Sequence, residues 1–292
     1  MTSPAIEERI RRGSSRVELL TGASVEITAA DRARLPEAAR LLPAGTRVHL
    51  TFLGGEAATE REATAGAVAD LGLTPVPHLA ARRIRSRPEL VGHLDRLAAC
   101  GAGERAFLVA GDPPHPLGPY DDALALLDSP LLTGHRELGV AGYPDGHPAI
   151  ATETLWRALA TKAAVLAARG QAGSVVTQFG FDADRVLGWI AEARQRGVEL
   201  PVRVGVAGPA SARKLLRFAA RFGVASSAGI VRKYGLSLTN LLQPAGPDRF
   251  VEALVSGYDP VRHGEVTLHL YTFGDLPRAA EWLAVALDRS RP

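Results

Sequence analysis

The chain has one cysteine, few aromatic residues and no long apolar run. With Cys100 alone among 292 residues, neither an intrachain disulfide nor a metal site built on several cysteines can form. No window approaches the roughly 18 apolar residues that a membrane helix needs. The first thirteen residues mix acids and bases without an apolar centre, which is unlike a signal peptide. These absences predict a soluble, cytoplasmic protein that has no membrane partner.

Charge of one sign is also scarce. Lysine and arginine number 34 against 31 for aspartate and glutamate, so the net charge is +3. The two arginine clusters, 9–12 and 82–85, are short and lack interleaved aromatic residues, and we therefore expect no nucleic-acid partner. The pI of about 9.3 is the only feature that favours a structural or nucleic-acid-associated protein. An apolar content of 46% with so little net charge excludes disorder for most of the chain.

Short apolar runs alternate with longer helical patterns along the whole chain, which is typical of βα units around a parallel sheet. The expected strands are Ser24–Thr28, Arg47–Phe52, Thr74–Leu79, Ala106–Ala110, Gly139–Gly142, Ser174–Gln178, Pro201–Val206 and Val266–Tyr271. The expected helices between them include Ala58–Leu71, Pro88–Ala99, Thr152–Arg169, Asp182–Arg196, Ser211–Phe222 and Leu276–Asp288.

Eight such units predict an α/β fold, a single (β/α)8 TIM barrel that spans residues 1–292 as one domain. An extra helix over Ala5–Leu20 forms an N-terminal extension within residues 1–22, and a helical insertion lies between Ala225 and Tyr258, before the last strand. The competing doubly wound sheet usually carries Gly-x-Gly-x-x-Gly after its first strand, and none is present here.

Chemistry in such a barrel occurs at the carboxyl ends of the strands. Polar and aromatic residues at the expected strand ends suit a planar heteroaromatic ligand, with one carboxylate that donates or accepts a proton. Each of these side chains also has an ordinary structural interpretation, such as an ion pair or a stabilised turn, but their occurrence at one end favours a site. The histidines are dispersed and show no metal-binding spacing, so no metal is expected. The strand-end residues are Glu26, Thr51, His78, Asp112, Tyr143, His147, Gln178 and Tyr271.

Six segments in register along this pattern resemble the methylenetetrahydrofolate reductase family. They are Ser24-Val25-Glu26-Ile27, Val76-Pro77-His78-Leu79, Gly111-Asp112-Pro113-Pro114, Gly142-Tyr143-Pro144-Asp145-Gly146-His147-Pro148, Thr177-Gln178-Phe179-Gly180-Phe181-Asp182 and Leu268-His269-Leu270-Tyr271-Thr272. The resemblance implies an FAD-containing barrel that interconverts 5,10-methylenetetrahydrofolate and 5-methyltetrahydrofolate, with NADH or NADPH as electron donor. It also implies a folate substrate and a homo-oligomer.

The resemblance also assigns roles to individual residues. Glu26 would be the general acid, with a pKa raised by burial near the flavin, and Asp112 would act beside it and contact both flavin and pterin. The residues implied for flavin binding are Thr51, His78, Ala110, Gly111, Asp112, Tyr120, Tyr143, His147 and Lys162. Those implied for folate are Gln178, Phe181 and Tyr271. Glu18 is a second candidate for the catalytic carboxylate, although it fits the preceding helix whereas Glu26 fits a strand.

The chain departs from the family pattern mainly where folate would bind. Ala110 replaces the arginine of the family's Arg-Gly-Asp loop, and Thr272-Phe273-Gly274-Asp275 replaces Thr-Leu-Asn-Arg after the last strand. These departures indicate a divergent branch. They leave open an enzyme that works in the oxidative direction in methyl-group catabolism, and a non-catalytic homologue that retains a flavin or folate pocket.

Overall fold

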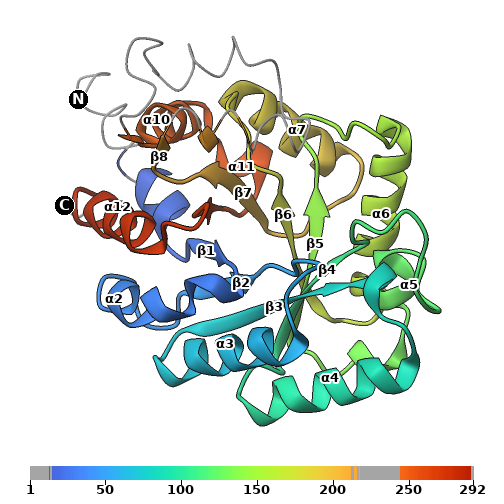
Figure 1. Cartoon of the computed structure of the whole chain (residues 1–292). Helices are drawn as coiled ribbons and strands as arrows, with labels where there is room; N and C mark the ends of the chain where they lie inside the picture. The colour runs from blue at the N-terminus through green and yellow to red at the C-terminus, as the bar shows by residue number, and fades with distance from the viewer. Residues whose placement is uncertain (1–12, 14, 212–213, 216, 218–243, 291–292) are drawn as a thin grey trace, which may run out of the picture.

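Eight parallel strands close into a barrel in sequential order, with helices on its outside (Figure 1). The computed structural model describes residues 13, 15–211, 214, 215, 217 and 244–290. The barrel strands are β1 (Ser24–Ile27), β2 (Arg47–Leu50), β3 (Thr74–Ala80), β4 (Arg105–Val109), β5 (Glu137–Gly142), β6 (Ala172–Thr177), β7 (Val202–Ala207) and β10 (Val266–Tyr271). Strand β10 pairs with both β7 and β1, which completes the (β/α)8 barrel that the sequence predicts.

The helices of the outer layer begin and end close to their predicted residues. They are α3 (Ala58–Asp70), α4 (Arg87–Ala99), α6 (Thr152–Ala168), α7 (Ala183–Gln195) and α12 (Leu276–Asp288). Ser86 and Asp182 accept hydrogen bonds from Glu89 N and Arg185 N, which caps the amino ends of α4 and α7. Shorter helices that the pattern did not specify are η1 (Ala29–Arg34), α2 (Leu35–Ala39), η2 (Ala81–Arg83), α5 (Ala123–Leu127), η3 (Pro130–Leu132) and α11 (Pro260–His263), whereas α10 (Asp248–Gly257) lies within the predicted insertion.

Two predicted segments fall partly outside the described residues. Of the expected N-terminal helix, residues 15–20 are helical. Most of the expected helix Ser211–Phe222 and most of the insertion lie outside the described residues. Helix α10 falls within the insertion and is helical, as predicted. The short strands β8 (Ala210–Ser211) and β9 (Pro244–Ala245) pair antiparallel beside the barrel. Among the described helices, none is long and apolar enough to cross a membrane.

Alternation along the strands separates an apolar outer face from a more polar interior. The main core packs helices against the outward residues of the strands, such as Val25, Val48, Leu108 and Val204. A separate small cluster inside the barrel contains Val76, Phe107 and Val176. The inward positions of β1, β2, β7 and β10 include Glu26, Arg47, His49, Arg203 and His269, so much of the remaining interior is polar.

Gly205 of β7 faces a neighbouring backbone that leaves no space for a side chain. A Cβ atom there would lie 2.4 Å from Thr177 O and 2.7 Å from Phe179 N. We expect Gly205→Ala to lower the free energy of unfolding by about 1–3 kcal/mol, because backbone must shift. Gly188→Ala in α7 is the matched control, since nothing lies within 4 Å of its added carbon, and it should stabilise by about 0.5–1 kcal/mol. Urea unfolding measures the free energy of unfolding of both variants. Equal changes in the two variants would contradict the prediction.

Candidate active site

A cavity of about 690 Å³ opens at the carboxyl ends of the barrel strands. This volume lies within the range of roughly 300–1,000 Å³ that small-molecule sites occupy. Eight of the side chains or backbone positions predicted for the site line it, namely Glu26, Thr51, His78, Gly111, Asp112, Tyr143, Gln178 and Tyr271. Thr28, Phe52, Leu53, Ala80, Phe107, Val109, Val176, Thr272 and Phe273 also contribute to the lining.

Glu26 lies at the inner end of this cavity, with 17% of its side chain exposed. Its Oε2 lies 3.5 Å from His269 Nε2 and 3.7 Å from His78 Nε2. Burial acts to raise the pKa of Glu26, but the interaction with His269 and the charges of His78 and His269 outweigh it, and the net pKa is lowered. Glu18, the alternative carboxylate, is exposed on the helical segment 15–20 and does not line the cavity.

Three histidine rings pack under Glu26 inside the barrel. The His49 ring centroid is 4.6 Å from that of His269 and 5.7 Å from that of His78. Ser24 Oγ hydrogen-bonds to His269 Nδ1 at 2.8 Å, which fixes the ring with Nε2 toward Glu26. Burial lowers the pKa of His78 to about 4 and that of His49 well below its usual value. His78 is therefore neutral at pH 7.

Asp112 lies at the cavity rim and is held by an arginine from another segment. Arg83 donates from Nε and Nη2 to the two carboxylate oxygens, each at 2.7 Å. The Asp112 side chain nevertheless remains 73% exposed, so its other lone pairs are open to a ligand. Arg83 thus brings a guanidinium to the loop in which Ala110 stands where the family has arginine.

The cavity wall opposite Asp112 contains aromatic side chains, and hydrogen bonds to the backbone hold it in place. Tyr271 OH donates to Thr177 O at 3.1 Å, and Thr272 Oγ1 donates to Glu26 O at 2.7 Å. Phe273 adopts a left-handed backbone with φ of 51°, a conformation that is uncommon for a residue with a side chain. Its ring lies 6.3 Å from Tyr271 at an interplanar angle of 27°. Gln178 Oε1 accepts from Phe179 N at 3.0 Å, which leaves its amide group for a ligand.

Five predicted site residues lie outside the cavity lining. Ala110 O accepts a hydrogen bond from Arg82 N, and Tyr120 is buried in the main core. His147 forms a turn in which its Nδ1 accepts from Ala149 N. Lys162 lies in α6, where burial lowers its pKa and the charge of Asp122 partly offsets that effect. Phe181 packs edge-on against Phe179, with centroids 5.9 Å apart.

Sequence reasoning did not identify several residues that shape the site. Phe52 lines the cavity, and Arg61 Cζ lies 3.7 Å from its ring centroid. His49 and His269 lie directly below Glu26. Strand alternation could have indicated both histidines, because Glu26 is in register with His49 and Ser24 with His269. Strand alternation could not have indicated Arg83, because its hydrogen bond to Asp112 joins residues that are 29 positions apart in the sequence.

The cavity fits a flat ring system better than it fits a diphosphate. Polar groups on or just after β1, β2, β3, β5 and β6 surround one apolar space, as a ring with hydrogen-bonding edges requires. Among the described residues, its lining contains no lysine or arginine, so the ring portion of FAD has partners here whereas its phosphates have no cation within the cavity. The described residues also contain no group of three or more His, Cys, Asp or Glu arranged to hold a metal.

The closed parallel barrel with a carboxylate in its carboxyl-end cavity defines a (β/α)8 protein with a small-molecule site. Residues 29–273 match the model of the family described as methylenetetrahydrofolate reductase, and the chain therefore belongs to that family. Membership supports, at the level of the family, an enzyme of the folate-related oxidoreductase kind. The match begins just after Glu26 and includes every other predicted site residue.

Solved barrels of several kinds are similar to the chain in outline. One is dihydropteroate synthase from Thermus thermophilus in complex with 6HMPPP, at 15% identity and TM-score 0.49, covering 90% of this chain and 91% of that one. Another is 3-dehydroquinate dehydratase from Aquifex aeolicus, at 10% identity and TM-score 0.47, covering 92% and 99%. Likeness at this level adds nothing to the functional assignment.

Proposed function

We propose that the chain interconverts 5,10-methylenetetrahydrofolate and 5-methyltetrahydrofolate, with FAD as cofactor and NADH or NADPH as electron donor. Family membership supports the class of reaction. The observation that carries the proposal is the position of Glu26, a largely buried carboxylate at the inner end of a cavity that Asp112 and Gln178 also line. Opening the methylene bridge of the folate requires a proton at its nitrogen, and Glu26 is the group placed to deliver it.

The chain's own residues would orient two flat rings and move this proton. Thr51, His78, Gly111 and Tyr143 would contact the flavin ring, and bound FAD would supply the hydride relay between nicotinamide and folate. Asp112 and Gln178 would hydrogen-bond the pterin edge. A ligand that fills the cavity removes water from the exposed part of Glu26, which strengthens the burial effect and raises its pKa toward that of a useful acid.

An absorbance spectrum of the purified protein is the first test. We expect flavin bands, anaerobic bleaching by NADH or NADPH, and reoxidation by 5,10-methylenetetrahydrofolate. If a bound flavin bleaches but the folate never reoxidises it, the cofactor assignment stands and the substrate assignment is wrong. A colourless protein that binds no added FAD would overturn the flavin proposal and leave the cavity to the nicotinamide and folate rings alone.

A further inference from the structure

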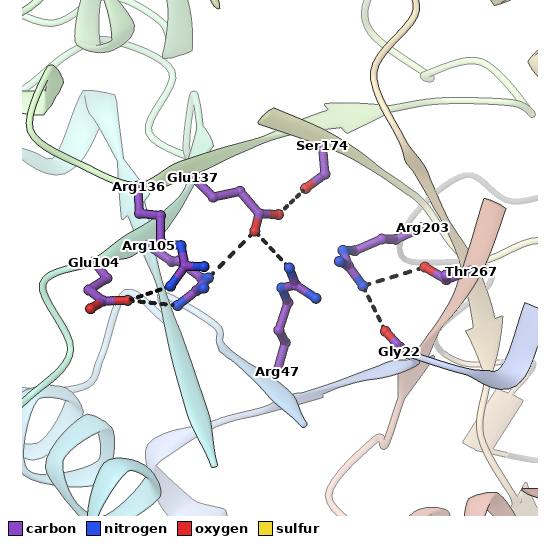
Figure 2. A network of polar contacts seen from close by, with 9 residues as sticks. All are labelled: Gly22, Arg47, Glu104, Arg105, Arg136, Glu137, Ser174, Arg203 and Thr267. Carbon is purple, nitrogen blue, oxygen red and sulfur yellow. Dashed lines mark hydrogen bonds and ion pairs between the residues drawn. The ribbon is translucent and has the colours of Figure 1, made fainter. Parts of the chain in front are cut away.

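A second polar cluster occupies the amino end of the barrel, opposite the cavity (Figure 2). Its members are Arg47, Arg105, Glu137, Ser174, Arg203 and Thr267, and we call them the floor cluster. Each lies within the first three residues of its strand. Because all eight strands are parallel, these positions meet at one end. The reaction proposed above uses none of them.

Glu137 is the single carboxylate at the centre of the floor cluster. Its Oε2 accepts from Arg47 Nη2 at 2.9 Å and lies 3.5 Å from Arg105 Nε, while its Oε1 accepts from Ser174 Oγ at 3.1 Å. Burial acts to raise the pKa of Glu137, but Arg47, Arg203 and Ser174 outweigh it and the pKa is lowered. Glu137 is therefore ionised, and its single charge faces the guanidinium groups of Arg47 and Arg105 directly.

Arg203 forms no ion pair with a carboxylate of the described part of the chain. It is 5% exposed, and its Nη1 donates to two neutral acceptors, Gly22 O at 2.9 Å and Thr267 Oγ1 at 3.4 Å. Burial and then the charge of Arg47 lower its pKa to about 10, and the more distant charges of Glu137 and Glu265 offset this only in part. This guanidinium is therefore held next to a like charge without a carboxylate in contact.

The three arginines also leave donors unused. The Nε atoms of Arg47 and Arg203 are buried and have no hydrogen-bond partner among the described residues, and Arg105 Nε approaches Glu137 Oε2 at 3.5 Å without forming a hydrogen bond. Glu104 lies at the edge of the cluster and pairs with Arg105 and Arg136, so it does not serve Arg47 or Arg203. Buried donors are rarely left unsatisfied in proteins, and buried charges are rarely left unpaired.

We propose that the floor cluster binds a small inorganic oxyanion such as phosphate between Arg47 and Arg203. Guanidinium groups present paired donors that match the oxygens of such an anion. Arg47 keeps 30% of its side chain exposed, so the anion can enter from solvent. This site stabilises the fold and is separate from the cavity at the other end, whose described lining offers no cation.

Calorimetric titration of the whole protein with phosphate tests the proposal, with chloride at equal ionic strength as the control for screening. We expect saturable phosphate binding and a thermal midpoint that rises with phosphate but not with chloride. Glu137→Gln removes the competing carboxylate and should tighten phosphate binding at least tenfold. A purely structural ion-pair network would predict instead that this variant is destabilised and gains no affinity.

Two further variants localise the anion. Arg47→Gln should weaken phosphate binding at least tenfold, whereas Arg136→Gln, whose side chain is 72% exposed at the edge, should leave it unchanged. If Arg47→Gln does not fold, the comparison of wild type with Glu137→Gln still decides. Absence of saturable binding by the wild type, or equal affinities in wild type and Glu137→Gln, would overturn the proposal.

Discussion

Replacing Glu26 with glutamine is expected to lower kcat by about 10²–10⁴-fold, because the reaction loses its general acid. Glutamine keeps the length of the side chain and can still contact His78 and His269, which lie 3.7 and 3.5 Å from the carboxylate. Ligand affinity and flavin spectrum should therefore change little. Stopped-flow measurement of the reductive and oxidative half-reactions separates the effects, since only the folate half-reaction needs this proton.

Glu62→Gln is the matched control for this substitution. Glu62 is also a buried glutamate, but it pairs with His93 and Arg96 on the outer helices and does not line the cavity. We expect it to reduce stability and leave kcat unchanged. If Glu26→Gln retains activity within tenfold of wild type, Glu26 is not the general acid. An inactive wild type that still binds ligand would favour the non-catalytic alternative.

The outline of the barrel was predictable because local patterns decide it. Strands β2, β3 and β10 begin at the predicted residues, and helices α3, α6 and α12 do so as well. Hydrophobic alternation and helix caps act over a few residues, and both are visible in a single sequence. The short helices α5 and α11 were not predicted, because helices of four or five residues carry too little periodicity to be recognised.

The inner part of the site was predictable for a different reason. Parallel strands bring their carboxyl ends together, so Glu26, His78 and Gln178 had to meet once the barrel was assigned. The outer part depends on how long loops fold back. Lys162 lies near Asp122 at the start of α5 and not in the cavity, and no local pattern in the sequence determines that position.

The side chains inside the barrel are neighbours that the order of residues along the chain does not reveal. His49, His78 and His269 look dispersed in sequence, yet the pairing of the strands packs their rings together as one layer next to Glu26, with the His49 centroid 5.7 Å from that of His78 and 4.6 Å from that of His269. Arg47, Arg105 and Arg203 form a second such layer at the floor. Each layer is assembled from strands far apart in the chain, so only the closed register of the sheet reveals either one.

The buried histidine layer should make the fold sensitive to acid from about pH 6.5 downward. His78 has a folded-state pKa of about 4 against 6.5 for an unperturbed histidine, and the pKa of His49 is also well below its usual value, in both cases mainly because of burial. Between those pH values the unfolded chain binds protons that the folded chain does not, so stability falls as pH falls. For His78 alone the difference between the two pKa values corresponds to about 3 kcal/mol by pH 4.

His49→Gln tests this expectation, because it removes one titrating ring that does not itself line the cavity. Each such histidine contributes a slope of about 1.4 kcal/mol per pH unit while only the unfolded state is protonated, so the variant should lose that much from the pH dependence of its unfolding free energy between pH 6 and 5.

His93, His135, His147 and His263 also have lowered pKa values, chiefly through burial, and they contribute equally to wild type and variant. The exposed His115 provides the control, and His115→Gln should leave the slope unchanged. Identical slopes for wild type and His49→Gln in urea unfolding would contradict this expectation, because they would show that His49 accepts a proton as readily in the folded state as in the unfolded state.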